Sequence, residues 1–86
     1  MAKVEIYTGM MCGYCSAAKR LLKQKGVEFE ETDTSFNSGK KNEMISRANG
    51  GRSVPQIFID GEHIGGCDEL YALDSVGELD AKLGLA

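Results

Sequence analysis

The sequence predicts one α/β domain: a four-stranded mixed β-sheet with helices on both faces, in the element order βαβ-α-ββ-α. Two observations lead to this fold class. Near the start of the chain a strand, a helix of about 13 residues and a second strand follow one another, and such a βαβ unit places its two strands parallel. Farther along, the pair Asp60-Gly61 separates two short strands and is a strong signal for an antiparallel hairpin.

The first half of the chain supplies the βαβ unit. Alternating apolar residues predict a strand over residues 3–8. The helix that follows has its apolar positions on one stripe and ends at Lys25-Gly26, a basic last turn with a left-handed stop. The stripe consists of Tyr14, Ala17, Ala18, Leu21 and Leu22. A second alternation predicts the next strand over residues 27–30.

The second half of the chain supplies a helix, the hairpin and the C-terminal helices. The second helix begins at Asn37 or Ser38 and extends through Ala48. Residues 56–59 and 62–64 form the hairpin strands, and a third helix begins after a glycine pair. A short helical piece is expected near the end. The inward positions predicted for these helices are Met44, Ile45, Ala48, Leu70, Leu73, Leu79 and Leu83.

Composition and charge exclude several classes of function. A chain of 86 residues leaves no room for a second core, so one domain is expected from residue 1 to residue 86. A net charge of -3 does not provide the broad basic surface that binds DNA or RNA. No apolar run approaches the roughly 18 residues of a membrane span. An export signal would need a continuous apolar stretch near the first residues, and Glu5 interrupts it. We therefore expect the protein to reside in a reducing cytoplasm.

The strongest chemical feature is the motif Cys12-Gly13-Tyr14-Cys15, where the first strand gives way to the first helix. Free N–H groups and the positive dipole end at a helix start favour an anion, so we expect Cys12 to be held as the nucleophilic thiolate. Cys15 lies about one turn into the helix, more sheltered and within disulfide range. The predicted chemistry is attack by Cys12 on a substrate disulfide and resolution by Cys15.

Two other interpretations of the cysteine pair stay open. In one, both are ordinary small core residues, although the strand-to-helix geometry forces one of them toward solvent. In the other, Cys12 and Cys15 join His63 and Cys67 in a zinc site of three thiolates and one imidazole. A lone histidine on a strand, however, more often faces water.

The segment around Pro55, the sole proline of the chain, suggests one wall of a ligand groove. If the Val54–Pro55 bond is cis, the backbone groups of Val54 face outward and can pair with an extended thiol peptide, as an added strand would. The plainer interpretation is that the proline only marks an edge or a turn.

The segment Gly65-Gly66-Cys67-Asp68 suggests a second wall. The glycines let a ligand approach the main chain, the helix start donates N–H groups to a carboxylate, and Asp68 accepts from an amine. A ligand with a free α-amino-acid end carries both charges. The alternative is that Asp68 only caps the helix. Cys67 is expected to be a buried or half-buried free thiol.

Together these segments resemble a small glutaredoxin of the bacterial dithiol kind. The resemblance runs along nearly the whole chain, through Val4-Glu5-Ile6-Tyr7, Cys12-Gly13-Tyr14-Cys15, Val54-Pro55-Gln56-Ile57-Phe58-Ile59 and Ile64-Gly65-Gly66-Cys67-Asp68-Glu69-Leu70. A Cys-x-x-Cys motif alone is shared with many oxidoreductases, but three motifs in this order are much more specific. Thioredoxins, by contrast, have a Trp before the first cysteine, and this chain has none.

The resemblance implies a thioredoxin fold and the reduction of protein disulfides and glutathione mixed disulfides at the expense of glutathione. It implies that Cys12 is the nucleophile and Cys15 the resolving thiol. The implied glutathione-binding residues are Tyr14, Arg52, Val54, Pro55, Gly66, Cys67 and Asp68. Among these, Val54 meets the backbone of the glutathione cysteine beside a cis Pro55, and the γ-glutamyl end sits on the Cys67 amide and the Asp68 carboxylate.

Two positions depart from the family pattern. Gly13 stands where most relatives have proline, which removes the φ restraint and restores a backbone N–H near the thiolate. Gly9 stands where relatives commonly carry a lysine for the glycine carboxylate of glutathione. Either Arg52, Lys41 or another basic residue supplies that cation, or glutathione binds more weakly, and Asn42 is a further polar candidate.

The alternative function within the same family is a carrier: a dimer that holds a [2Fe-2S] cluster through Cys12 of each chain and two glutathiones. Gly13 is compatible with this role, but Tyr14 and Cys15 stand where the dedicated carriers have Phe and Ser. We therefore expect a monomer whose partners are glutathione and disulfide-containing or glutathionylated proteins, with no nucleic acid and no membrane.

Overall fold

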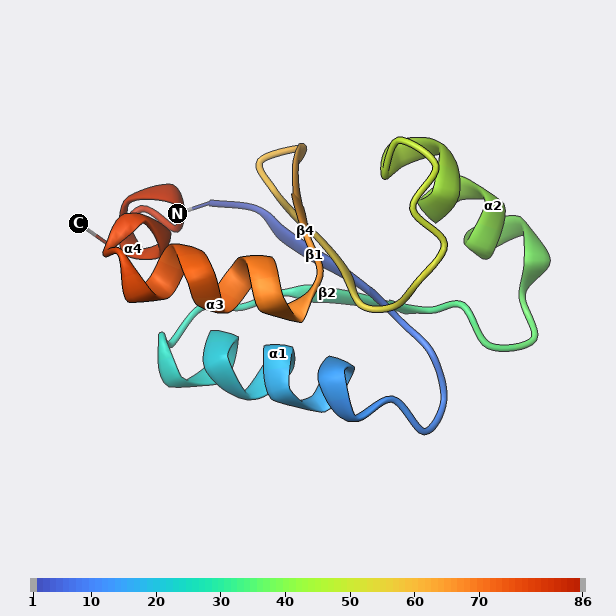
Figure 1. Ribbon diagram of the computed structural model, residues 1–86, viewed down its shortest axis with the longest axis horizontal. Helices are drawn as coiled ribbons and strands as arrows, with labels where there is room; N and C mark the ends of the chain where they lie inside the picture. Colours follow the sequence, from blue (N-terminus) through green and yellow to red (C-terminus); the bar gives the residue numbers. More distant parts are fainter. Residues whose placement is uncertain (1, 86) are drawn as a thin grey trace.

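The computed structural model describes residues 2–85, and four strands and four helices lie within them (Figure 1). In chain order they are β1 (Val4–Thr8), α1 (Gly13–Gln24), β2 (Glu30–Asp33), α2 (Ser38–Arg47), β3 (Gln56–Ile59), β4 (Glu62–Gly65), α3 (Cys67–Ser75) and α4 (Glu78–Lys82). Of these helices α1 is the longest, with 12 residues, and none is long and apolar enough to cross a membrane.

The strands form one mixed sheet in the order β2-β1-β3-β4. β1 pairs parallel with β2, whereas β3 runs antiparallel to both β1 and β4. The predicted βαβ unit and hairpin are therefore confirmed. In the hairpin turn Asp60 has φ 50° and Gly61 has φ 81°, the two positive values that a tight turn between twisted strands requires.

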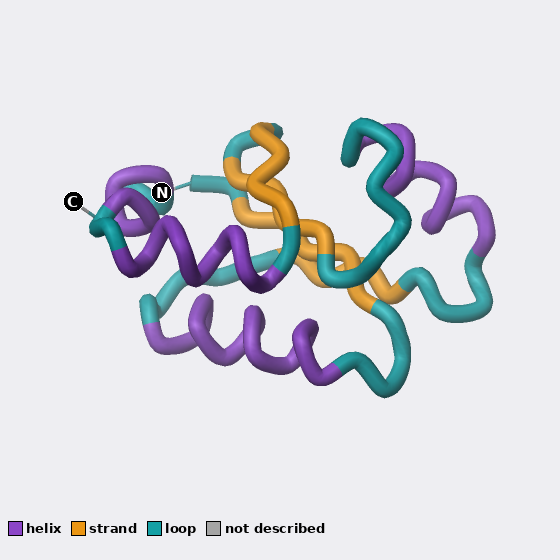
Figure 2. The backbone as a smooth tube through the Cα atoms, in the orientation of Figure 1, coloured by secondary structure: helices purple, strands orange, loops and turns teal. Residues whose placement is uncertain are grey.

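Side chains on one face of the sheet form the larger core, which α1, α3 and α4 cover (Figure 2). Strand residues alternate between faces, so Val4 and Ile6 point into this core together with Ile57 and Ile59. The helices contribute Ala18, Leu21, Leu22, Leu70, Leu79 and Leu83, all buried. The helices α1 and α3 begin at the same end of this layer, so the two N-termini lie near one another.

A second, smaller core lies on the opposite face beneath α2. Tyr7 and Phe58 point into it from the sheet, and Met44 and Ala48 pack on them from the α2 segment. Tyr7 is therefore a core residue, because the sheet is covered on both faces and β1 is central.

Two sequence-based expectations need correction. The second strand spans Glu30–Asp33 rather than residues 27–30, because Val27 still closes the end of α1: its N–H donates to the Leu22 carbonyl at 3.4 Å. Tyr14 does not belong to the buried stripe of α1. Tyr14 is 67% exposed, whereas the next residue, Cys15, is the one that turns inward.

Candidate active site

Cys12 is the N-cap residue of α1 and the last residue of the loop after β1. Its backbone is extended (φ -104°, ψ 104°). Its Sγ accepts a hydrogen bond from the backbone N–H of Cys15 at 3.1 Å. The sulfur thus takes the place of the side-chain oxygen that caps most helices, where N–H donors and the helix dipole favour negative charge. The side chain is half-buried, so solvent reaches it from one side.

Cys15 lies one turn farther along α1, and only 2% of it is exposed. Burial, followed by the hydrogen bond to Cys12, raises the pKa of its thiol to about 12. The backbone N–H of Gly9 and the ammonium of Lys19 act in the opposite direction. The two cysteines therefore differ: one sulfur is reachable at the helix start, and the other is buried and protonated behind it.

A groove begins beside Cys12 and runs between α1, the segment before β3 and the start of α3. Its volume is about 290 Å³. The lining residues are Tyr14, Ser53, Val54, Pro55, Gly66, Cys67, Asp68 and Glu69. Cys12 Sγ lies 3.6 Å from the Val54 carbonyl oxygen, which places the sulfur at the groove. The Val54–Pro55 peptide bond is cis.

The start of α3 forms the second wall of the groove. Gly66 is its N-cap, and the Gly66 N–H donates to Glu69 Oε1 at 2.7 Å. A Cβ on Gly66 would lie 3.3 Å from the Pro55 carbonyl oxygen, so the close approach of the two walls favours glycine. The interpretation of Asp68 as the cap of this helix is wrong: Asp68 is exposed in the first turn of α3.

Arg52 is the one predicted glutathione-binding residue that does not line this groove. It lines a neighbouring recess together with Gly9, Phe36 and Lys41. Val54 lines both hollows and separates them. The two candidate cations of the sequence analysis thus line one recess together with Gly9.

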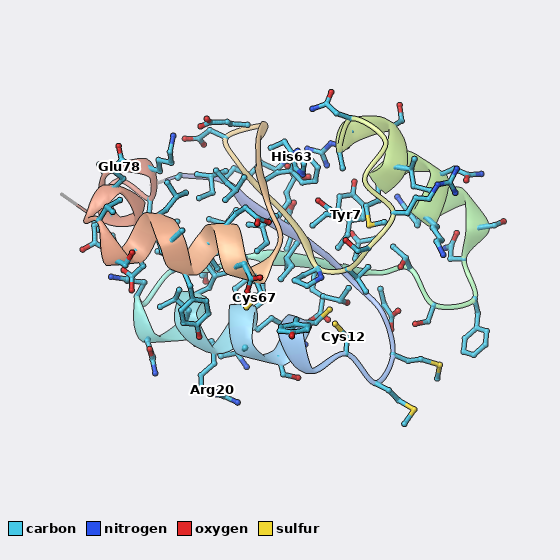
Figure 3. The ribbon with its side chains drawn as sticks, viewed as in Figure 1. Tyr7, Cys12, Arg20, His63, Cys67 and Glu78 are labelled. Atoms are coloured by element: carbon cyan, nitrogen blue, oxygen red, sulfur yellow. The ribbon has the colours of Figure 1, made fainter. Side chains whose placement is uncertain are left out.

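The alternative interpretation, a zinc site of Cys12, Cys15, His63 and Cys67, finds no support in the described residues. Across residues 2–85 no group of three or more histidine, cysteine or acidic side chains is placed to hold a metal ion. His63 instead bonds Gln56 Oε1 through Nε2 at 2.7 Å and packs against Phe58, with ring centroids 5.1 Å apart. Cys12 and Cys67 lie near the starts of α1 and α3, whereas His63 lies away from them (Figure 3).

Cys67 is a buried free thiol, as expected. Burial raises the pKa of this thiol, and the nearby negative charges of Asp68, Cys12 and Glu69 raise it further. Cys67 therefore lines the groove as a neutral side chain, and its chemistry differs from that of Cys12.

Two lining residues, Ser53 and Glu69, were not anticipated from the sequence. The spacing of Glu69 three residues after Gly66 is that of a capping box, so a signal for its contact was present. Ser53 gave no such signal. Its neighbour Arg52 was the more obvious polar candidate.

The sequence pattern of the glutaredoxin family matches residues 4–64. The chain belongs to the glutaredoxin family. It is 58% identical over 83 residues to Glutaredoxin 3 of Escherichia coli K12, covering 96% of this chain and 99% of that protein. It is 55% identical over 82 residues to a probable glutaredoxin of Synechocystis, covering 95% of this chain and 93% of that one.

Solved glutaredoxin structures share the fold. The solution structure of glutaredoxin from Brucella melitensis superposes with a TM-score of 0.85 at 48% identity and covers 99% of this chain and 91% of that one. A buckwheat glutaredoxin–glutathione complex gives a TM-score of 0.84 at 29% identity, with 96% and 77% covered. The chain therefore has the thioredoxin fold and, as a glutaredoxin, is a glutathione-dependent thiol–disulfide oxidoreductase.

Proposed function

We propose that Cys12 is the attacking sulfur of this oxidoreductase. Its thiolate attacks one sulfur of a substrate disulfide, a Cys12 mixed disulfide forms, and the other substrate sulfur leaves as a thiolate and takes a proton from solvent. The observation that carries this assignment is the position of Cys12 Sγ, which accepts the Cys15 N–H at 3.1 Å and lies 3.6 Å from the Val54 oxygen at the groove.

Cys15 is the resolving thiol. After it loses its proton, its sulfur attacks Cys12 Sγ, the Cys12–Cys15 disulfide forms, and the second substrate sulfur leaves as a thiolate. Glutathione then reduces the intramolecular disulfide in two exchange steps. Burial of Cys15 supports this division of roles, because a sulfur that is 2% exposed reaches Cys12 more readily than an external substrate.

The groove binds glutathione. The main chain of Val54, beside Pro55, pairs with the peptide backbone of glutathione next to its sulfur, and the exposed ring of Tyr14 flanks that sulfur. The γ-glutamyl end lies at the start of α3. There the Cys67 N–H donates to its carboxylate, Gly66 leaves room for it, and Asp68 accepts from its ammonium group.

Arg52 binds the glycine carboxylate of glutathione from the neighbouring recess, with Lys41 as a second cation. Support comes from their common recess with Gly9 and from Val54, which lines both hollows. An arginine here presents a planar fork of hydrogen-bond donors to a carboxylate. A lysine at the position of Gly9 would offer that carboxylate only a point charge.

The physiological setting follows from the same chemistry. The partners are glutathione and proteins that carry disulfides or glutathione adducts. The protein acts as a single domain over residues 1–86 and as a monomer in a reducing cytoplasm, where a glutathione pool regenerates the thiols.

The experiment that tests the assignment is glutathione-coupled reduction of a glutathione mixed disulfide and of a protein disulfide, each with the parent, Cys12→Ser and Cys15→Ser proteins. We expect Cys12→Ser to lose both activities. We expect Cys15→Ser to keep the first activity and lose most of the second. Equal rates for the parent and Cys12→Ser would overturn the proposal.

A further inference from the structure

A second hollow, which shares no lining residue with the glutathione groove, is lined by both Cys12 and Cys15. We call this hollow the rear recess. Its lining residues are Thr8, Gly9, Met11, Cys12, Gly13, Cys15, Ser16, Lys19, Glu31 and Asp33. Its charged members come from two elements: Lys19 from α1, and Glu31 and Asp33 from β2. The buried Cys15 therefore shares a recess with charged side chains that do not line the glutathione groove.

Lys19 is held at the wall of the rear recess by one acidic partner. It lies four residues after Cys15, so the two side chains share a face of α1. Its ammonium group donates to Glu31 at 3.1 and 3.3 Å. Glu31 also accepts from the Thr8 hydroxyl at 2.8 Å, which fixes the carboxylate on the sheet. Glu31 thus holds the Lys19 ammonium in the same recess that Cys15 lines.

The resolving step needs a Cys15 thiolate, and its surroundings change when Cys12 enters a mixed disulfide. In the reduced protein, Cys12 raises the pKa of Cys15 through both a hydrogen bond and its charge. A Cys12 sulfur bonded to substrate carries no charge and no proton, so both effects end. Burial still raises the pKa of Cys15, and the Gly9 N–H and the Lys19 ammonium still lower it.

We propose that the Lys19 ammonium stabilises the Cys15 thiolate during its attack on the mixed disulfide, and that Glu31 weakens this stabilisation by holding Lys19 in an ion pair. Lys19 is a positioning residue that acts through Cys15, and the inference rests on the proposed role of Cys15 as resolving thiol. The proton of Cys15 passes to water in the rear recess, and the departing substrate thiolate takes one from solvent.

The two partners of this ion pair have opposite effects on the resolving step. Lys19→Met keeps the aliphatic stem and removes the charge, so the Cys15 thiolate is harder to form. Glu31→Gln keeps an acceptor for the Thr8 hydroxyl, frees the Lys19 charge and removes a negative charge near the sulfur. Loss of packing or of a structural ion pair, in contrast, would give both variants an effect of the same sign.

The test follows the resolving step directly. Reduced protein is mixed with oxidised glutathione and quenched with acid at successive times, and mass spectrometry quantifies the Cys12–glutathione adduct and the Cys12–Cys15 disulfide. We expect Lys19→Met to slow conversion of adduct to disulfide about fivefold, and Glu31→Gln to accelerate it about twofold. Lys19→Arg restores most of the rate. Lys23→Met, an exposed lysine one turn on, leaves the rate unchanged.

The dependence on pH gives a second readout. Below the pKa of Cys15 the thiolate fraction rises about tenfold per pH unit, so log rate against pH is a straight line for each protein. We expect parallel lines, with Lys19→Met below the parent and Glu31→Gln above it. Asp33→Asn removes the other acid of the rear recess. We expect its line to fall between those of the parent and Glu31→Gln, because Asp33 accepts from the Ser35 N–H at 2.8 Å and does not bond Lys19.

The outcomes separate this inference from the role of Cys15 itself. Equal conversion rates for the parent, Lys19→Met and Glu31→Gln overturn the role of the ion pair, and so does slowing by both variants. If Cys15→Ser releases the adduct as fast as the parent does, Cys15 is not the resolving thiol, and the proposed function fails at that point instead.

Discussion

At the scale of single residues, the difference between two sulfurs three positions apart explains the chemistry. Cys12 caps the helix and is half-buried at the end of a groove, whereas Cys15 is enclosed by the helix and the strand behind it. The same backbone turn that exposes one sulfur buries the other. A single strand-to-helix junction therefore places an accessible sulfur and a buried one three residues apart.

Asp68 gives a prediction at this scale. Its carboxylate is exposed in the first turn of α3 and lines the groove, and in the proposed function it binds the ligand ammonium group. We expect Asp68→Ala to raise the KM for glutathione about tenfold, the effect of losing one charge-assisted hydrogen bond. Stability should fall by less than about 1 kcal/mol. The measurements are steady-state kinetics and urea unfolding.

The matched control is Glu78→Ala, which removes an exposed acid from the first turn of α4. Figure 3 shows Glu78 at the α4 end of the molecule, away from Cys12. This variant should leave the KM for glutathione unchanged. A KM for Asp68→Ala equal to that of the control, with a loss of stability near 1 kcal/mol, would mean that Asp68 serves only the helix.

How far the site could be predicted depends on whether its signal is local. Cys12, Val54 and Asp68 stand in short motifs whose chemistry can be worked out from neighbouring residues. The ion pair of Lys19 with Glu31 joins two elements that meet only in the folded chain, 12 residues apart, and no spacing rule finds it. Local motifs were therefore predicted and long-range pairs were missed.

At the scale of elements, α2 is attached to the sheet by an ion pair as well as by its apolar face. Arg47 binds Glu5 on β1 through both terminal nitrogens at 3.0 Å, donates to the Tyr7 hydroxyl at 2.8 Å and lies over the Phe58 ring at 4.2 Å. Tyr7 also donates to Glu43. This polar layer fixes the position of α2 on its face of the sheet.

Arg47→Met tests this attachment. At pH 7 we expect a loss of about 2 kcal/mol in the free energy of unfolding, because the Glu5 carboxylate and the Tyr7 hydroxyl lose a charged partner while the stem over Phe58 is kept. The Arg47 guanidinium lowers the pKa of Glu5 from its ordinary value of 4.5. The stability that this ion pair contributes is present above pH 4.5 and is lost as the pH falls below it. The free energies of unfolding of parent and variant therefore converge in acid.

The control for Arg47 is Lys40→Met on the same helix. Lys40 pairs only with Glu43 at 3.5 Å on the exposed side of α2, so its loss should cost less than about 0.5 kcal/mol. Urea unfolding between pH 3 and pH 7 measures the free energy of unfolding of both variants and of the parent. A difference between parent and Arg47→Met that is the same at pH 3 and pH 7 would contradict the ion-pair account.

The elements were predicted in the right order, and their errors have a physical cause. The alternation at residues 27–30 suggested a strand because Val27 and Phe29 both turn inward, yet they pack on the end of α1 and pair with no neighbour strand. β2 itself, Glu30–Asp33, has no apolar residue. It is an edge strand whose place is set by pairing with β1, and hydrophobic periodicity cannot reveal such a strand.

At the scale of the whole molecule, two cores share one sheet. The candidate active site lies where α1 and α3, which cover the larger core, begin. Under the proposed roles of the two cysteines, an intramolecular Cys12–Cys15 disulfide competes with any ligand shared between the Cys12 sulfurs of two chains. The protein as a whole is therefore suited to reversible disulfide exchange within one chain.

This competition predicts the outcome of anaerobic reconstitution with iron, sulfide and glutathione. We expect the parent protein to remain a colourless monomer by gel filtration and visible absorption. The matched variant is Cys15→Ser, which removes the competing thiol and tests whether Cys12 alone can hold a cluster between two chains. A coloured dimer formed by the parent would establish the cluster carrier as a function of this chain.

The measurement closest to the centre of the account is the position of the first glutathione adduct. Reduced Cys15→Ser protein is treated with one equivalent of oxidised glutathione at pH 7, and the modified cysteine is identified by peptide mass spectrometry. The account predicts a single adduct on Cys12, with Cys67 unmodified. An adduct on Cys67 that forms as fast as one on Cys12 would contradict it.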